Sequence, residues 1–386
     1  MDRYLSPFIK KDSTKKIILL SGPRQSGKTT LAKQIFQSHD YLNFDSSEDR
    51  EALLKKQWKR DVECVIFDEL HKMPKWKQWL KGIYDTEGNK PHLLVTGSAN
   101  LDTFRKVGDS LAGRYFRFRL HPIDVEEGVT YWQSNPQEVF QRLMKYSGFP
   151  EPFLEGNIDF YKRWQKTHLD VILRQDFLDM YSIRSIKSIE LLVDLLKPRI
   201  SSPTSFSNLA RDLQVDPKSI QNWLTMLENI YALFRVTPYH DNIARSLLKE
   251  PKFYFYDIAR ISDEGARLEN LVALALLKRI QFLEDVHGHE GSLHYLRTKD
   301  GVELDFLVRI DGRPILCVEV KTSDGKLSKN FSYFKKFIKE AQCVQLVSNL
   351  KREYDTHDGI RVRNLATYLA TLSSTLLPPR AKRESW

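Results

Sequence analysis

This sequence of 386 residues has only 3 cysteines, and no hydrophobic run approaches the length of about 20 residues that spans a bilayer. Cys64, Cys317 and Cys343 lie singly in apolar stretches. They show neither the paired spacing of a zinc site nor the density of a disulfide-stabilised secreted domain. The first residues lack the apolar segment of a signal peptide. We therefore expect a cytoplasmic protein with no membrane partner, in which the cysteines are small core residues.

The chain is long enough for more than one hydrophobic core, because single cores stop growing at about 250 to 300 residues. Its 60 lysines and arginines outnumber its 50 aspartates and glutamates, which gives a formal net charge of +10. Such an excess suits a polyanionic partner such as DNA, although a basic surface that only keeps a protein in solution explains it equally well. The charge alone therefore leaves a DNA partner open.

Residues 22–29 fit the phosphate-binding loop G-x-x-x-x-G-K-[ST] at every fixed position. Apolar residues 17–20 predict a buried strand before the loop, and residues 30–36 predict a helix after it. Backbone amides in such a loop bind polyphosphate, so we expect ATP here, with Lys28 on the β- and γ-phosphates and Thr29 on magnesium. The expected nucleotide-binding residues in the loop are Gly22, Pro23, Arg24, Gln25, Ser26, Gly27, Lys28, Thr29 and Thr30.

A second predicted strand, residues 63–69, ends in two carboxylates. Acids at the carboxyl end of a buried strand lie where α/β sheets bind ligands. Asp68 would complete the magnesium shell, and Glu69 would orient or deprotonate the water that attacks the γ-phosphate. The alternative is a strand that simply ends in solvent on two acids. We assign no role to the neighbouring His71.

Small hydroxyl residues follow a third predicted strand, residues 92–96. Thr96 and Ser98 could hydrogen-bond the γ-phosphate or the attacking water, although such residues also make ordinary turns and helix caps. Further on, Arg114 precedes a strand with alternating polarity. It could act as an arginine finger on the nucleotide of a neighbouring subunit, which requires a homo-oligomer, but a guanidinium at a strand start is more often solvated or paired.

The alternation of strands and helices predicts an α/β fold with a parallel sheet. The segments that carry a family resemblance are residues 22–30, 67–69, 96–98, 110–114, 148–151, 242–247, 252–257, 269–272 and 300–306. Together they resemble a prokaryotic family in which an AAA-type ATPase precedes domain of unknown function 4143. One departure is Ser147, where the family usually has glycine.

The resemblance implies a P-loop NTPase sheet of the AAA+ type, then a helical and winged-helix-like segment, then a PD-(D/E)xK restriction-endonuclease-like α/β domain. The expected segments are an ATPase domain at 1–130, a helical lid or linker at 131–200, a helix-turn-helix at 201–240, a nuclease-like domain at 241–375 and a basic tail at 376–386.

Residues 201–236 predict a helix-turn-helix independently of the family, because two stretches of helical apolar spacing flank a break. Asp216 would cap the second helix, with Pro217 in its first turn. Lys218, Ser219, Gln221, Asn222 and Thr225 would face outward, able to contact phosphates and base edges in a major groove. The alternative is a pair of packed helices that only joins two domains.

Residues 303–308 and 314–321 predict a strand hairpin. Glu319 and Lys321 are two apart and share one face, on which Asp305 of the neighbouring strand can converge. Such a cluster can bind magnesium through Asp305 and Glu319 and poise a water for attack on a phosphodiester. It resembles the D…ExK core of restriction-type nucleases, which often add a helical acid, here matched by Glu269. A surface hairpin of alternating charge is the alternative.

Our leading hypothesis is an ATPase that uses ATP and magnesium to control a DNA-binding C-terminal half, itself capable of magnesium-dependent DNA cleavage. The alternative is a nucleotide-dependent regulatory or defence switch, in which the nuclease-like domain binds a partner without catalysis. A small-molecule kinase would leave the Asp68 and Glu69 pair and the second half unexplained.

Overall fold

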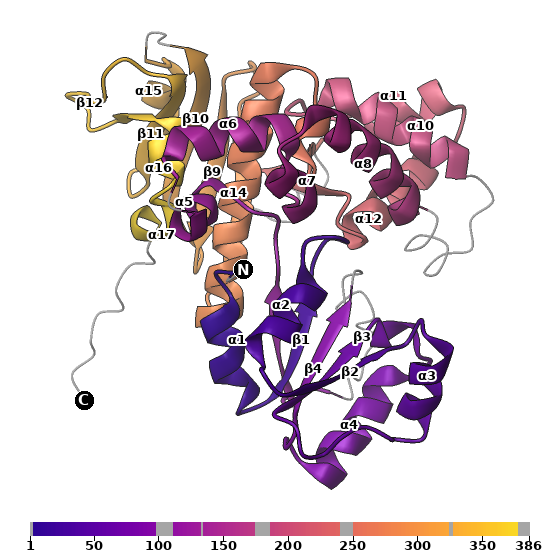
Figure 1. Ribbon diagram of the computed structural model, residues 1–386. Helices are drawn as coiled ribbons and strands as arrows, with labels where there is room; N and C mark the ends of the chain where they lie inside the picture. Colours follow the sequence, from indigo (N-terminus) through magenta and orange to yellow (C-terminus); the bar gives the residue numbers. More distant parts are fainter. Residues whose placement is uncertain are drawn as a thin grey trace. The chain divides into compact units, whose positions relative to one another are not determined.

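The computed structural model describes residues 3–97, 111–132, 134–173, 186–239, 250–323 and 327–376 (Figure 1). It divides into two compact units, each assembled from three stretches of chain. The first unit comprises Met1–Ile123, Gly148–Val193 and Leu209–Phe234, and the second comprises Asp124–Ser147, Asp194–Asn208 and Arg235–Trp386.

The first unit is built on a five-stranded, fully parallel sheet, as the sequence predicts. In sheet order its strands are β2 (His39–Asn43), β3 (Cys64–Asp68), β4 (His92–Gly97), β1 (Ile17–Ser21) and β5 (Tyr115–Arg119). Because β4 pairs with both β1 and β3, Asp68 lies opposite Thr96 and Ser21 lies opposite Gly97. The register therefore brings the phosphate loop, the acid pair and Thr96 to one edge of the sheet.

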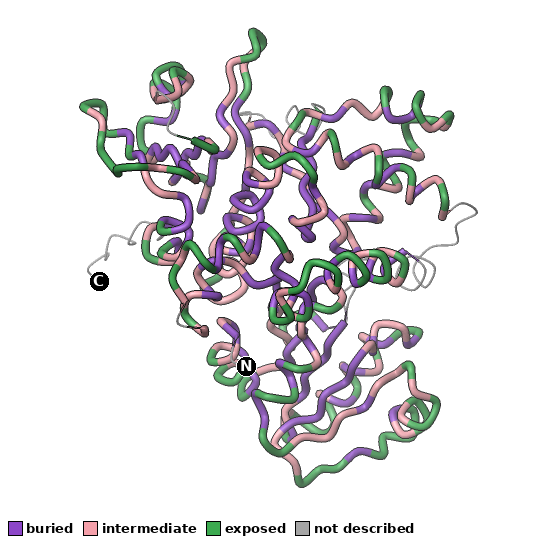
Figure 2. The backbone as a smooth tube through the Cα atoms, turned by 45° about the horizontal axis from the view of Figure 1, so that its top comes forward, coloured by how far each residue is buried: buried purple, intermediate pink, exposed green. Residues whose placement is uncertain are grey.

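Strands β1 and β3 are buried along their whole length, which explains why both consist almost entirely of apolar residues. Trp58, Phe67 and Trp79 pack edge to face on one side of the sheet, with ring centroids 5.3 to 5.9 Å apart. Figure 2 shows that the exposed stretches lie largely on helices and loops. The helices of this unit include α1 (Ser6–Ser13), α2 (Lys28–Ile35), α3 (Ser47–Leu54), α4 (Trp76–Glu87), α7 (Pro150–Glu155) and α8 (Ile158–Val171).

The two helices predicted within residues 201–236 are present as α11 (Phe206–Leu213) and α12 (Pro217–Asn229), which follow α10 (Ile186–Leu196). The Asp216 side chain accepts a hydrogen bond from the Ser219 amide at 3.0 Å, with Pro217 in the first turn, so the predicted cap is confirmed. Ile220, Leu224 and Leu227 form the buried face of α12.

The second unit is built on an eight-stranded mixed sheet. In sheet order its strands are β12 (Tyr354–Asp355), β13 (Arg361–Asn364), β11 (Gln342–Asn349), β10 (Arg313–Ser323), β9 (Glu303–Ile310), β8 (Gly291–Arg297), β6 (Leu233–Pro238) and β7 (Lys252–Phe255). The predicted hairpin is confirmed as the antiparallel pair β9 and β10, whose turn places Asp311 and Gly312 at positive φ. The long helix α14 (Glu264–His287) packs on β7 to β10.

The remaining helices of the second unit are short. They are α5 (Val125–Trp132), α6 (Pro136–Tyr146), α15 (Asn330–Phe334), α16 (Leu365–Leu369) and α17 (Leu372–Thr375). The three cysteines are buried and free, in agreement with their expected role in the core. Within the described ranges, no helix combines the length and hydropathy needed to cross a bilayer.

Candidate functional site

A cavity of about 600 Å³ in the first unit contains the predicted phosphate loop and acid pair. Of the loop residues predicted to bind nucleotide, those that line the cavity are Arg24, Gln25, Gly27, Lys28, Thr29 and Thr30. Gly22, Pro23 and Ser26 belong to the same loop without lining it. Asp68 and Glu69 line the cavity as well, so residues about 40 positions apart in the sequence meet at one site.

The loop backbone depends on its two fixed glycines. A Cβ on Gly22 would lie 2.3 Å from the carbonyl oxygen of Leu120, and Gly27 takes φ 94° immediately before α2. No side chain caps the amino end of α2. Its first backbone amides are therefore available to an anion, in keeping with the dipole of the helix.

Lys28 is buried, and its ammonium group bonds to the loop itself. Its Nζ donates to the carbonyl oxygens of Gly22 at 3.0 Å and Pro23 at 2.7 Å. A phosphate oxygen carries more negative charge than a carbonyl oxygen and makes the stronger hydrogen bond with an ammonium. The geometry therefore holds the lysine in the loop, ready to exchange these carbonyls for phosphate.

Asp68 connects three elements around the cavity. Its Oδ2 accepts hydrogen bonds from Thr29 Oγ1 and from the Tyr41 hydroxyl, both at 2.8 Å, and its Oδ1 accepts from Thr96 Oγ1. Burial, together with the hydrogen bond to Asp68, raises the pKa of Tyr41. The sequence interpretation missed Tyr41, because only the pairing of β2 with β3 brings it to Asp68.

The Thr29 hydroxyl and the Asp68 carboxylate at the phosphate loop suit magnesium. Thr29 and Asp68 supply a hydroxyl and a carboxylate, and magnesium prefers few protein ligands completed by waters and phosphate oxygens. Among the residues that the structure describes, no group of three or more His, Cys, Asp or Glu side chains could hold a metal ion by itself. This site would therefore depend on nucleotide phosphate to complete its metal shell.

Glu69 has the environment of a general base. Its side chain is only 13% exposed, its Oε2 accepts no hydrogen bond, and His71 Nε2 lies 3.6 Å away. Burial raises the pKa of Glu69 to about 7, although the positive charges of Lys28 and Arg24 oppose the shift. A carboxylate that titrates near neutral pH can take a proton from water efficiently. The residue also adopts φ 55°, a strained backbone conformation of the kind found at functional sites.

Arg114 lies at the other end of the sheet from this cavity. Its carbonyl oxygen accepts from the amide of Ile17 at the start of β1, whereas the phosphate loop follows the end of β1. Its guanidinium bonds to Asp85, with Nε to Oδ1 at 2.7 Å. Arg114 therefore cannot reach the nucleotide of its own chain. Its guanidinium is paired, which is the alternative that the sequence left open, and a role on the nucleotide of a neighbouring subunit stays a prediction. Ser98 lies outside the described residues.

Arg3 is a buried cation beside the loop that the sequence interpretation missed. It is 3% exposed and lines the cavity. Its guanidinium donates to the carbonyl oxygens of Ser26 at 2.8 Å and His121 at 2.7 Å. Arg3 thus joins the phosphate loop to the segment after β5 and adds positive charge to the cavity wall.

Helix α7 forms another wall of the cavity through Pro150, Glu151 and Leu154. The preceding Gly148 sets its position, because a Cβ there would lie 2.2 Å from the carbonyl oxygen of Ile123. Segment 148–151 is part of the family resemblance in the sequence, but that resemblance does not predict its place at the cavity.

Helix α8 also contacts the phosphate loop. His168 Nε2 lies 3.3 Å from the carbonyl oxygen of Arg24. The same ring packs against Phe149, with centroids 4.6 Å apart, and stacks on Trp164 at 4.3 Å. Both α7, through Pro150 near Gly27, and α8, through His168 at Arg24, therefore lie beside the loop.

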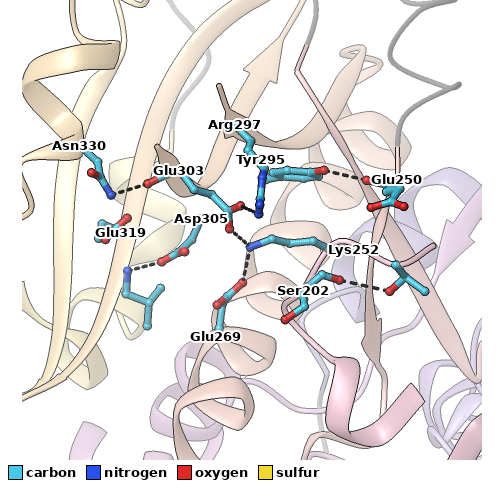
Figure 3. Close-up of polar contacts among 12 residues, drawn as sticks. Ser202, Glu250, Lys252, Glu269, Tyr295, Arg297, Glu303, Asp305, Glu319 and Asn330 are labelled. Carbon is cyan, nitrogen blue, oxygen red and sulfur yellow. Dashed lines mark hydrogen bonds and ion pairs between the residues drawn. The ribbon is translucent and has the colours of Figure 1, made fainter. Parts of the chain in front are cut away.

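The carboxylates predicted near the C-terminus converge in the second unit (Figure 3). Asp305 lies on β9, Glu319 on β10 and Glu269 on α14; Glu319 is buried, and the other two are partly buried. Lys321 Nζ lies 2.7 Å from Glu319 Oε1. The four residues expected to act together are therefore brought to one place.

Lys252 is a further member of this cluster that the sequence interpretation missed. It is 1% exposed, and its Nζ lies 3.2 Å from Glu269 Oε1 and 2.6 Å from Glu303 Oε1 (Figure 3). The Tyr254 hydroxyl donates to the same oxygen of Glu269 at 2.7 Å. The quoted segment 252–257 contains both residues, but nothing in its spacing indicates a contact with α14.

The cluster crowds several carboxylates together beside two lysines. Burial and the charges of Glu269 and Glu319 raise the pKa of Asp305 well above its usual range. Asp305 Oδ2 already accepts from the Val320 amide at 2.7 Å. One oxygen of Asp305 is therefore occupied by a backbone amide, whereas Glu319 Oε2 is buried and accepts no hydrogen bond. Lys252 and Lys321 offset part of the negative charge of this cluster.

Comparison with known families divides the chain into three matches. Residues 14–129 match the AAA domain family, residues 137–261 match a domain of unknown function (DUF8612), and residues 264–368 match a domain of unknown function (DUF4143). The resemblance stated from the sequence is therefore confirmed for the AAA domain and for DUF4143, with DUF8612 between them.

Relatives that match over most of their length exist in archaea and bacteria. An uncharacterized protein of Methanocaldococcus jannaschii is 24% identical, over 87% of this chain and 81% of its own length. An uncharacterized protein of Mycobacterium tuberculosis is 24% identical over 81% and 72%, and one of Haemophilus influenzae is 24% identical over 80% and 83%.

Solved structures give weaker matches. A RuvB variant of Thermotoga maritima overlaps 60% of this chain and 87% of its own, at 15% identity and a TM-score of 0.31. NtrX of Brucella abortus in complex with ATP overlaps 58% and 66%, at 12% identity and a TM-score of 0.25. Both scores are too low to support an argument about fold or function.

Proposed function

We propose that this chain, in which an AAA domain precedes DUF8612 and DUF4143, binds ATP with magnesium and hydrolyses it. The observation that carries the proposal is the contact of Thr29 with Asp68 at the mouth of the loop. This contact joins α2 to the acid pair Asp68 and Glu69, so that a nucleotide bound at the loop would have a hydroxyl and a carboxylate beside its magnesium ion.

Each residue around the cavity then has a specific part. Lys28 turns from its two carbonyl partners to the β- and γ-phosphates, and Thr29 and Asp68 hold magnesium, which would neutralise developing phosphate charge. Glu69 holds the attacking water and takes its proton. Thr96 keeps Asp68 oriented by donating to its second oxygen.

Assembly into a homo-oligomer is part of this proposal. AAA domains often assemble, and Arg114 can reach a nucleotide only in a neighbouring subunit. In that assembly Arg114 would exchange its Asp85 partner for phosphate. Replacing Arg114 with alanine should then lower turnover in the oligomer without changing the affinity for ATP, and an undiminished rate would remove this role.

We propose nucleic acid as the partner of the C-terminal half. The net charge of +10 supports it, as do the exposed side chains of Lys218, Gln221 and Asn222 on α12. Ser219 contributes less than expected, because its hydroxyl bonds to Asp216 at 2.6 Å. ATP hydrolysis would then control how this half engages the nucleic acid.

For the restriction-nuclease-like part, binding without cleavage is the better supported of the two hypotheses. The specific observation is Lys252, whose ammonium lies between Glu269 and Glu303. For cleavage, Glu269 would have to leave Lys252 before it could join Asp305 and Glu319 around magnesium. The regulatory hypothesis needs only a stable domain that binds its partner.

One experiment tests these proposals together. The full-length protein is incubated with branched, single-stranded or duplex DNA, with and without ATP and magnesium, and phosphate release and strand breaks are measured in the same samples. We expect ATP turnover that DNA changes, without strand breaks. Metal-dependent breaks that disappear in Glu319→Ala would establish cleavage instead. Absence of turnover in every sample would contradict the ATPase proposal.

A further inference from the structure

The outer side of α15 and the turn after it carry a pair of exposed aromatic rings. Phe337 is 72% exposed and Tyr333 is 45% exposed, and their ring centroids lie 5.8 Å apart. Phe337 is the most exposed large hydrophobic side chain in the described part of the chain. A single exposed aromatic ring is ordinary on a protein surface, whereas two in contact form a small platform.

The inner side of the same segment is firmly anchored. Phe331 and Phe334 are buried in a core cluster that includes Leu304 and Leu307 of β9. Asn330 Nδ2 donates to the carbonyl oxygen of Glu303 at 2.7 Å (Figure 3). The anchored side fixes the backbone, so the outer rings of this segment are held on the surface.

Positive charge surrounds the two rings. Residues 327–341 contain four lysines and one acid, Glu340, and Lys336 and Lys339 are exposed. We call the set Lys329, Tyr333, Lys335, Lys336, Phe337 and Lys339 the aromatic-basic surface.

The chemistry of this surface selects among partners. Protein interfaces are depleted in lysine, which disfavours a protein partner here. Duplex DNA keeps its bases stacked inside, where exposed rings cannot reach them. A single strand offers flat base faces and a phosphate at every nucleotide, and proteins that bind it combine aromatic stacking with a basic track. The aromatic-basic surface offers both.

We propose that the aromatic-basic surface binds single-stranded nucleic acid, with bases stacked on Tyr333 and Phe337 and phosphates paired with Lys336 and Lys339. This proposal rests on the proposed nucleic-acid partner of the C-terminal half. It adds that the nucleic acid is single-stranded and that it binds at the aromatic-basic surface. The bond between Asn330 and Glu303 places this surface next to the carboxylate cluster within the same unit.

The test measures binding of labelled single strands of about 20 nucleotides, oligo-dT and oligo-rU, and of a matched duplex, by fluorescence anisotropy with full-length protein. The variant carrying Tyr333→Ala and Phe337→Ala should lose about tenfold or more in single-strand affinity. Its affinity for duplex should stay unchanged. Tyr354→Ala is the matched control, because Tyr354 is 43% exposed in the same unit but lies between Glu353 and Asp355.

A second variant tests the lysines. Replacing Lys336 and Lys339 with alanine should reduce the slope of log affinity against log salt by about 1.4, at about 0.7 for each lost phosphate contact on a single strand. All replaced side chains are exposed, so thermal unfolding and ATP turnover should match the wild type.

The outcomes separate this inference from the functions on which it rests. Unchanged single-strand binding in the aromatic variant, or an equal loss in Tyr354→Ala, would overturn the aromatic-basic surface. If the wild type binds duplex alone, the surface is wrong but a nucleic-acid partner stands. If it binds neither form, both are wrong, and ATP turnover in the same preparations decides the ATPase proposal independently. A preference for oligo-dT or oligo-rU identifies the polymer and supports the surface in either case.

Discussion

Replacing Glu69 with glutamine removes a buried charge while keeping the shape of the side chain. Burial raises the pKa of Glu69 from its ordinary 4.5 to about 7 in the folded protein. The folded state therefore holds this proton more tightly than the unfolded state does. Glutamine cannot titrate, so the variant lacks that pH dependence.

The sign and size of the effect follow from this difference. Below pH 4.5 the carboxyl group is neutral in both states and makes no contribution. As the pH rises from 4.5 through 7, the wild type loses stability, and above that range the buried charge costs about 3 kcal/mol. The glutamine variant should thus gain up to about 3 kcal/mol relative to wild type between about pH 5 and pH 8.

Equilibrium urea denaturation without nucleotide measures this gain, with tryptophan fluorescence as the signal. Trp58, Trp76 and Trp79 lie in or against the core of the first unit and report on its unfolding. Glu48→Gln, at an exposed position on α3, is the matched control and should show no such change with pH. If the difference in unfolding free energy between Glu69→Gln and wild type is the same at about pH 5 and about pH 8, the raised pKa of Glu69 is wrong.

Three further predictions concern other parts of the structure. Gly148→Ala should destabilise the first unit by about 1 to 3 kcal/mol in denaturant titrations, because the new Cβ would meet a backbone oxygen. Gly82→Ala, in open space on α4, is the control and should stabilise the same unit by about 0.5 to 1 kcal/mol. Lys252→Met should destabilise the second unit by about 3 to 5 kcal/mol, because it leaves Glu269 without its cation. The loss of stability should be smaller at acid pH, where Glu269 can be protonated, and an equal loss at every pH would argue against the ion pair. If Leu154 in the cavity wall contacts the base of ATP, Leu154→Asp should weaken binding of ATP in calorimetric titrations. Binding of tripolyphosphate, which lacks the base, should stay unchanged, and an equal loss for both ligands would exclude that contact.

The features predicted correctly from the sequence are those encoded locally. The phosphate loop, the strand that ends at Asp68 and the cap at Asp216 each depend on residues within a few positions of one another. The hairpin of β9 and β10 follows from alternation and a turn in the same way. Local patterns therefore gave the elements and most of the residues expected at both sites.

The features that the sequence did not predict depend on long-range packing. Tyr41 reaches Asp68 only through strand pairing, and Arg3 reaches the loop from the start of the chain. Lys252 was read as part of a family segment, because its two partners come from α14 and β9. The departure at residue 147 also acquires a physical meaning. Ser147 takes φ 68°, where the glycine usual in the family would be unstrained.

The central claim is that ATP and magnesium are held between the phosphate loop and the acid pair Asp68 and Glu69. The most direct measurement determines ATP affinity and phosphate release side by side in wild type, Lys28→Ala and Glu69→Gln. Wild type should bind and hydrolyse ATP, Lys28→Ala should lose binding, and Glu69→Gln should bind ATP without hydrolysing it. Undiminished turnover in both variants would contradict the central claim.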